Sequence, residues 1–81
     1  MTVHVLIFGA AASAAGSDRV MVVVGDHPTV DEISAALAEQ HPALRFALSA
    51  PRLAVNGAFA GRETVVAECD EVALITLVGG G

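Results

Sequence analysis

Apolar and polar residues at the start of the chain follow the pattern of a β-strand. Residues 2–8 are rich in β-branched and aromatic side chains, which favour extended structure. With a period of two, the odd positions from Val3 to Ile7 share one face and the even positions from His4 to Phe8 share the other. Both faces are largely apolar, so we expect this strand to lie in the middle of a sheet.

Three shorter segments have patterns of their own. Residues 9–16 are rich in alanine and end in glycine, which predicts a short helical turn. The strand pattern resumes over residues 19–24. Residues 43–48 could add another helical turn, whose Phe46 we expect in the hydrophobic core.

The longest helix is predicted in the middle of the chain. Thr29 and Glu32 have the spacing of a capping box, so the helix should begin at Val30. Apolar residues then recur every three or four positions, and Pro42 limits the helix to about three turns. One face of this helix is expected to pack on a sheet.

Asn56-Gly57 is the strongest turn signal in the chain. This pair readily adopts positive φ at both central positions of a type I′ turn, so residues 53–60 are predicted to form a β-hairpin. Residues 61–69 connect the hairpin to a final strand over residues 71–78. Three glycines follow at 79–81.

The predicted order is strand, strand, helix, hairpin, strand. A right-handed crossover through the helix would place the first and last strands side by side, which is the β-grasp arrangement. We therefore expect an α+β, ubiquitin-like β-grasp fold, with a mixed sheet of four to five strands packed against one main helix. The domain should span residues 1–78, followed by a flexible glycine tail at 79–81.

Size and charge exclude several classes of function. The 81 residues have a mass of 8.2 kDa, and a chain of this size buries only about 60% of its unfolded surface, which leaves little room for an enclosed substrate cavity. A self-contained enzyme is therefore not expected. The net charge of −5 repels nucleic acid and anionic membranes and favours a protein partner with a basic face. The chain has no lysine, so it offers no ε-amine for conjugation to itself.

Candidate metal and catalytic residues are scattered. Cys69 is the only cysteine, so neither an internal disulfide nor a cysteine-based metal cluster can form, and a cytoplasmic location fits this usage. His4, His27 and His41 fall in different predicted elements without ligand spacing, so we expect no metal site.

The glycine end is the segment most suited to chemistry. Residues 79–81 have no side chains and reach roughly 10 Å when extended, so they could carry the carboxylate of Gly81 into a narrow pocket of another protein. A free carboxylate reacts only after conversion to an acyl-adenylate or thioester by an enzyme that supplies ATP. The alternative is that these glycines are merely a frayed end.

Several motifs, in this order, resemble one family. They are Val5-Leu6-Ile7-Phe8-Gly9-Ala10, Pro28-Thr29-Val30, Leu53-Ala54-Val55-Asn56, Asp70-Glu71-Val72-Ala73 and the terminal glycines. Together they span almost the whole chain and resemble the small, sulfur-carrying subunit of molybdopterin synthase. Departures from the usual family pattern are Cys69 in place of glycine, Thr76 and Leu77 in place of prolines, the lack of an arginine near Ala12, and the additional Gly79.

The resemblance implies a sulfur carrier without a permanently bound cofactor. Gly81, preceded by Gly80, would be adenylated with ATP by an E1-like adenylyltransferase and converted to a thiocarboxylate. It would then enter the large catalytic subunit of molybdopterin synthase and give its sulfur to a pterin precursor. The resemblance also assigns partner binding to residues around the tail. These are Phe8, Phe59, Ile75 and Gly79.

Two other functions stay open at this point. A related carrier could deliver sulfur to thiazole (thiamine) or cysteine synthesis, because the acceptor is set by partners. A ubiquitin-like interaction module, with an inert tail, would bind a partner through the sheet surface alone.

Overall fold

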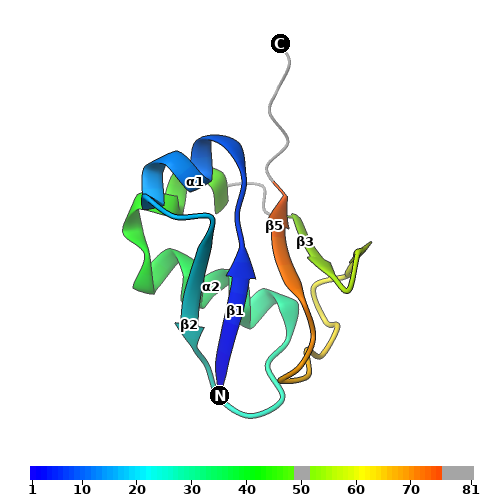
Figure 1. Ribbon diagram of the computed structural model, residues 1–81. Coiled ribbons are helices and arrows are strands. Elements are labelled where there is room, and N and C mark those ends of the chain that lie inside the picture. Colours follow the sequence, from blue (N-terminus) through cyan, green and yellow to red (C-terminus); the bar gives the residue numbers. More distant parts are fainter. Residues whose placement is uncertain (49–51, 76–81) are drawn as a thin grey trace.

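Two parallel strands, β1 (Thr2–Leu6) and β5 (Val72–Ile75), occupy the middle of a five-stranded sheet (Figure 1). The strand order is β2-β1-β5-β3-β4, and the other neighbouring pairs are antiparallel. The remaining elements are α1 (Gly9–Ala15), β2 (Arg19–Val23), α2 (Val30–Gln40), the 3₁₀ helix η1 (Pro42–Leu48), β3 (Arg52–Val55) and β4 (Ala58–Phe59). This computed structural model describes residues 1–48 and 52–75.

The backbone register confirms the predicted arrangement of the first and last strands. Val5 lies opposite Val72 in the parallel pair formed by β1 and β5, so β1 is a central strand as expected. The α+β class and the mixed β-grasp sheet are confirmed. The predicted continuation of the last strand to residue 78 and the predicted tail at 79–81 lie outside the described residues.

The hairpin between β3 and β4 has the predicted turn. Asn56 and Gly57 have φ values of 53° and 83°, which are the positive angles that a type I′ turn requires. With β3 and the two-residue β4, the hairpin spans residues 52–59, which is one residue earlier than the predicted 53–60.

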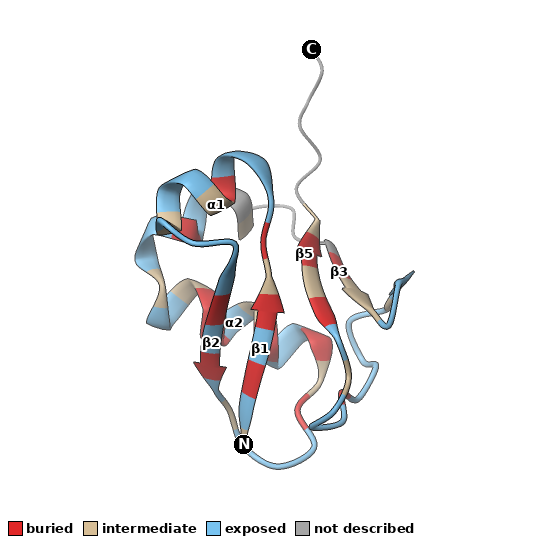
Figure 2. Ribbon diagram, viewed as in Figure 1, coloured by how far each residue is buried: buried red, intermediate tan, exposed pale blue. Residues whose placement is uncertain are grey.

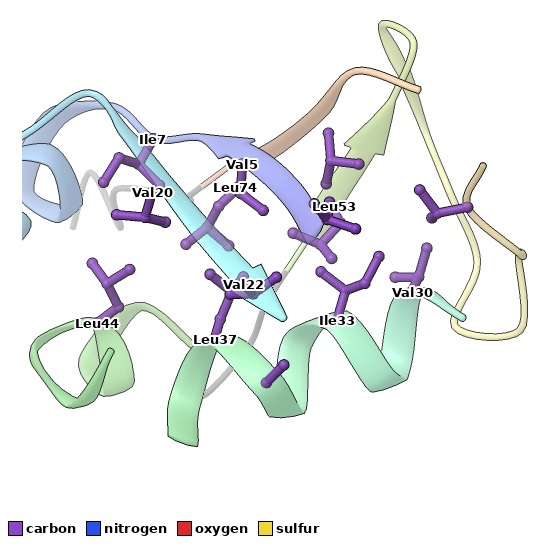
Figure 3. Packing of buried hydrophobic residues seen from close by; sticks show 14 of the residues in the cluster. Val5, Ile7, Val20, Val22, Val30, Ile33, Leu37, Leu44, Leu53 and Leu74 are labelled. Carbon is purple, nitrogen blue, oxygen red and sulfur yellow. The ribbon is translucent and has the colours of Figure 1, made fainter. Parts of the chain in front are cut away.

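One face of the sheet is buried against α2 (Figures 2 and 3). Figure 3 shows Ile33 and Leu37 of α2 pointing toward the sheet, and both side chains are fully buried. From the sheet, Val5 and Leu74 enter the same apolar cluster. Alternation along each strand therefore leaves every second side chain on the opposite, outer face.

The predicted capping box starts α2. The Thr29 hydroxyl accepts a hydrogen bond from the Glu32 backbone N–H at 3.2 Å, and the Glu32 carboxylate accepts one from the Thr29 backbone N–H at 3.2 Å. The next two backbone N–H groups, of Val30 and Asp31, donate to carbonyls of the 61–69 connector. The first turn of the helix is thus satisfied within the chain.

The expectation that Phe46 lies in the core is wrong, because its side chain is 55% exposed. Leu44, two residues earlier in η1, is fully buried instead. Since a 3₁₀ helix has three residues per turn, positions two apart point in different directions. Burying Leu44 therefore turns Phe46 toward solvent.

The free edge of β2 is covered by polar side chains from the end of α2. The Gln40 side-chain amide accepts a hydrogen bond from the Val23 N–H at 2.9 Å and donates to the Val23 carbonyl at 2.7 Å. His41 Nε2 lies 2.7 Å from the Met21 carbonyl oxygen. These contacts occupy backbone groups that an incoming strand would need. Addition of a partner strand at the β2 edge is therefore disfavoured.

Candidate partner-binding groove

A row of apolar side chains crosses the outer face of the sheet. In the backbone register, Leu6 lies opposite Ala73, which in turn lies opposite Ala54. Phe59 lies opposite Ala54 on the far side. Because the two central residues are alanines, their short side chains project less from the sheet than the side chains of Leu6 and Phe59 at the two ends of the row.

This row belongs to a groove of about 260 Å³, which we call the β5 groove. It is lined by Leu6, Phe8, Ala54, Gly57, Phe59, Glu71, Ala73 and Ile75. The groove thus brings together the three aromatic and aliphatic residues predicted to bind a partner, which are Phe8 at the N-cap of α1, Phe59 of β4 and Ile75 of β5. Their role in binding stays a prediction.

The two phenylalanines of the groove are largely exposed to solvent. Phe8 is 52% exposed and Phe59 is 64% exposed, although both are large apolar side chains. Exposed aromatic side chains gathered around a hollow are typical of surfaces that bind another molecule. The β5 groove therefore has the composition of a recognition site.

A hydrogen-bond network fixes the hairpin turn against the start of β5. The Asn56 N–H donates to the Glu71 carbonyl at 2.7 Å, and the Asn56 side-chain carbonyl accepts from the Glu71 N–H at 2.9 Å. The Asn56 amide also donates to the Asp70 carboxylate at 3.0 Å. The hairpin that carries Phe59 is therefore held against the start of β5.

Asp70 accepts a second hydrogen bond, from the backbone N–H of Ala67 at 2.9 Å. This bond, together with the bond from the Asn56 amide, holds the pKa of Asp70 below its ordinary value. The carboxylate is thus kept charged while it closes the turn that precedes β5.

The chemistry of the β5 groove is that of binding rather than catalysis. Glu71 is the one ionisable side chain among the described residues that line it, and no nucleophile accompanies it there. Ile75, the last described residue of β5, lines the groove. The predicted attachment residues Gly80 and Gly81, and the predicted contact residue Gly79, lie outside the described part of the chain.

A larger hollow of about 870 Å³ lies beside the start of α2. It is lined by Thr29, Asp31, Gly61, Arg62, Glu63 and Thr64. An exposed ion pair, with Arg62 Nη2 at 3.2 Å from Asp31 Oδ1, crosses this region. The residues that line this hollow, apart from Gly61, are polar or charged, and no aromatic or large aliphatic side chain is among them. The nearby helix N–H groups already donate to the connector, so the hollow offers less than the β5 groove for recognition.

Other candidate residues are dispersed in the structure as they are in the sequence. Within residues 1–48 and 52–75, no three His, Cys, Asp or Glu side chains lie close enough to hold a metal ion. Cys69 is exposed in the turn before β5. In the same part of the chain, none of the helices combines the length and apolarity needed to cross a bilayer.

Part of the groove is formed by residues that the sequence pattern does not single out. Ala54 and Ala73 form its low centre, Gly57 and Glu71 complete its lining, and none of the four was predicted as a site residue. The face shared by Leu6 and Phe8 was visible from strand alternation alone. The alanines could be found only from the register between strands.

The fold and the groove define a ubiquitin-like β-grasp protein, and comparison with solved structures agrees. SAMP1 of Haloferax volcanii is 30% identical, with each chain covered fully and a TM-score of 0.84. A Pyrococcus furiosus protein described as a candidate subunit 1 of molybdopterin converting factor is 17% identical, with 96% of this chain and 99% of that chain covered and a TM-score of 0.80. A further match is a chain in a structure from Helicobacter pylori that is described as a complex of subunits 1 and 2 of molybdopterin-converting factor. It is 23% identical, with full coverage of both chains and a TM-score of 0.68.

The chain belongs to the ThiS family, whose model matches residues 5–81. It is a ThiS-type, ubiquitin-like protein of the sulfur-carrier class. Among curated proteins, a sequence search finds no significant match.

Proposed function

We propose that the chain carries sulfur on the carboxylate of Gly81, as the small subunit of a molybdopterin synthase. The observation that carries this proposal is the position of the β5 groove beside Ile75, the residue from which the chain continues to Gly79, Gly80 and Gly81. A partner that covers the groove is thereby brought next to the start of the glycine-ended segment. Six residues follow Ile75 in the sequence, and they reach at most about 22 Å.

The proposed chemistry begins with activation by an E1-like adenylyltransferase. The Gly81 carboxylate attacks the α-phosphate of ATP, pyrophosphate leaves, and an acyl-adenylate forms. Sulfur at the oxidation level of hydrogen sulfide then attacks the acyl carbon, and AMP leaves with the electrons of the broken C–O bond. The product is a thiocarboxylate. Glycine at this end admits the chain into a narrow active site, because no side chain obstructs it.

The proposed partner of the thiocarboxylate is the large catalytic subunit. Support comes from the Helicobacter pylori neighbour, which is a complex of two molybdopterin-converting factor subunits. The exposed aromatic side chains of Phe8 and Phe59 give the β5 groove an apolar surface for such a partner, with Glu71 at its margin for a basic residue. The proposed compartment is the cytoplasm, where ATP is available.

A second candidate function is favoured by the identity with SAMP1, a small archaeal modifier protein. In that case the same activated carboxylate would be joined to an amine of another protein. Delivery of sulfur to thiazole or cysteine synthesis would also use the same carboxylate, because these routes differ in the acceptor.

Deletion of Gly80 and Gly81 tests the proposal. In cells that depend on this chain, the deletion should abolish molybdopterin formation while circular dichroism shows an unchanged fold. A matched control replaces Gly25, an exposed loop glycine, with alanine and should leave both readouts unchanged. Normal molybdopterin formation by the deletion variant would refute the proposal. Loss of thiamine or of protein conjugates instead would favour the other acceptors.

A further inference from the structure

The turn residues Asn56 and Gly57 can react with each other as well as shape the hairpin. The backbone nitrogen of a glycine that follows an asparagine has no neighbouring side chain to obstruct its approach to the asparagine side-chain carbonyl carbon. Both residues are exposed, and a Cβ added to Gly57 would meet no atom within 4 Å. The turn therefore has the composition and the access to water that deamidation requires.

Deamidation would remove the side-chain amide of Asn56 in two steps. First the Gly57 nitrogen bonds to the Asn56 side-chain carbonyl carbon and loses its proton to solvent, while the side-chain nitrogen takes up a proton and leaves as ammonia with the electron pair of the broken C–N bond. The product is a succinimide ring. Water then adds to either carbonyl carbon of the ring and one C–N bond breaks, which gives aspartate or isoaspartate.

The folded chain holds the reactive amide at both ends. The Asn56 side-chain oxygen accepts a hydrogen bond from the Glu71 N–H at 2.9 Å, and the side-chain nitrogen donates to the Asp70 carboxylate at 3.0 Å. Attack makes the planar amide carbon tetrahedral and ends in loss of the nitrogen, so the bond to Asp70 must break during the reaction. Because this bond is made to a charged group, it is among the stronger hydrogen bonds and restrains the amide.

Asp70 opposes the attack through its charge as well. The attack places negative charge on the Asn56 side-chain oxygen, and a carboxylate beside the amide raises the energy of that state. Hydrogen bonds from the Ala67 N–H and from the Asn56 amide lower the pKa of Asp70, so it stays ionised at neutral pH. The Glu71 N–H acts in the opposite direction, because it stabilises negative charge on the same oxygen. A hydrogen bond to a charged group is roughly twice as strong as a neutral one, so the effect of Asp70 is the larger.

The products fit the start of β5 less well than asparagine does. An aspartate at position 56 places a second carboxylate where the amide nitrogen lay, 3.0 Å from Asp70, and like charges at that distance disfavour each other. An isoaspartate adds a carbon atom to the main chain and so lengthens the two-residue turn. Either product weakens the attachment to β5 of the hairpin that carries Phe59 of the β5 groove.

We propose that Asn56 is a modification site, where Asp70 restrains deamidation and where the reaction, once it occurs, releases the hairpin from the start of β5. The change is one-way, because hydrolysis of the ring does not restore the amide. This inference concerns the chain by itself and does not depend on the proposed function.

The test measures deamidation of the intact chain at neutral pH. Asn56 is the only asparagine in the sequence, and cleavage after arginine releases it in peptide 53–62, where mass spectrometry distinguishes amide, aspartate and isoaspartate. The folded wild type should react at least about tenfold more slowly than the same chain in urea, because its bonded amide must first open. Equal rates with and without urea would overturn the proposal.

Asp70→Ala should accelerate deamidation of the folded chain by roughly tenfold or more, since it removes both the bond and the charge. Asp26→Ala is the matched control, because Asp26 is an exposed acid outside the hairpin, and its rate should equal that of the wild type. Circular dichroism reports whether each variant is folded. Where Asp70→Ala is unfolded, Asp70→Asn takes its place with a smaller increase, because it keeps an acceptor oxygen without the charge. A wild-type rate in the folded Asp70 variant would overturn the proposal.

Asn56→Asp tests the consequence of the reaction, because it is one of the two products. It should shift the urea unfolding midpoint to lower urea in the wild-type background and shift it less in the Asp70→Asn background, where the facing charge is absent. Equal shifts in the two backgrounds would contradict release of the hairpin by repulsion from Asp70.

Discussion

Replacing Phe59 with alanine should weaken partner binding through the β5 groove. Phe59 is 64% exposed, and a fully covered aromatic side chain buries about 150–250 Å², so a partner can cover roughly 100–160 Å² of it. At about 25 cal/mol per Å², the loss is about 2–4 kcal/mol. The dissociation constant for the large subunit should therefore rise roughly 30- to 900-fold. Isothermal titration calorimetry with the large subunit measures this change.

Phe46→Ala is the control for the effect of losing a phenylalanine. Phe46 is 55% exposed and lies in η1, outside the β5 groove, so the two variants should lose similar free energies of unfolding, about 1–2 kcal/mol at most. Urea unfolding measures that loss. Only Phe59→Ala should change the dissociation constant. If both variants raised the dissociation constant equally, or if neither variant changed it, the assignment of the groove as the binding surface would be refuted.

Three further predictions concern the fold that positions the groove. Leu37→Ala should lower the free energy of unfolding by about 2–5 kcal/mol in a urea titration, because Leu37 is fully buried under the sheet; a loss below about 1 kcal/mol would contradict this packing. Gly57→Ala should cost about 1–2 kcal/mol because φ is +83° there, whereas Gly25→Ala, in open space, should cost little; equal effects would be evidence against the turn. Since the folded pKa of Asp70 is depressed, its contribution to stability is present above the unfolded pKa and is lost as pH falls below about 4. In Asp70→Asn, the unfolding midpoint should therefore decrease less as the pH is lowered than it does in the wild type. The same pH dependence in both proteins would argue against this role.

Most of the fold could be predicted from the sequence because its signals are local. The Thr29 to Glu32 spacing placed the start of α2, and Asn56-Gly57 placed the hairpin turn, as the capping bonds and the φ angles confirm. The prediction that β1 and β5 are parallel neighbours came from the right-handedness of crossover connections, and no individual residue indicated it. The predicted burial of Phe46 was wrong, because composition shows that a residue is apolar but does not show in which direction its side chain points from a single helical turn.

The lining of the β5 groove could be predicted only in part, for a related reason. Phe8, Phe59 and Ile75 were identified by family resemblance, and they do line one groove. Ala54 and Ala73 were not identified, because a short side chain becomes a groove floor only when the register sets it between larger neighbours. Such cross-strand relations are long-range in sequence and leave no local signal.

Intact-protein mass spectrometry of the chain, coexpressed with its E1-like enzyme and a sulfur source, tests the central claim most directly. The account predicts a mass shift that corresponds to replacement of one carboxylate oxygen by sulfur, located at Gly81 by fragmentation, and no such shift when Gly80 and Gly81 are deleted. A chain that retains an unmodified Gly81 carboxylate, although the enzyme is active on a known carrier, would contradict it.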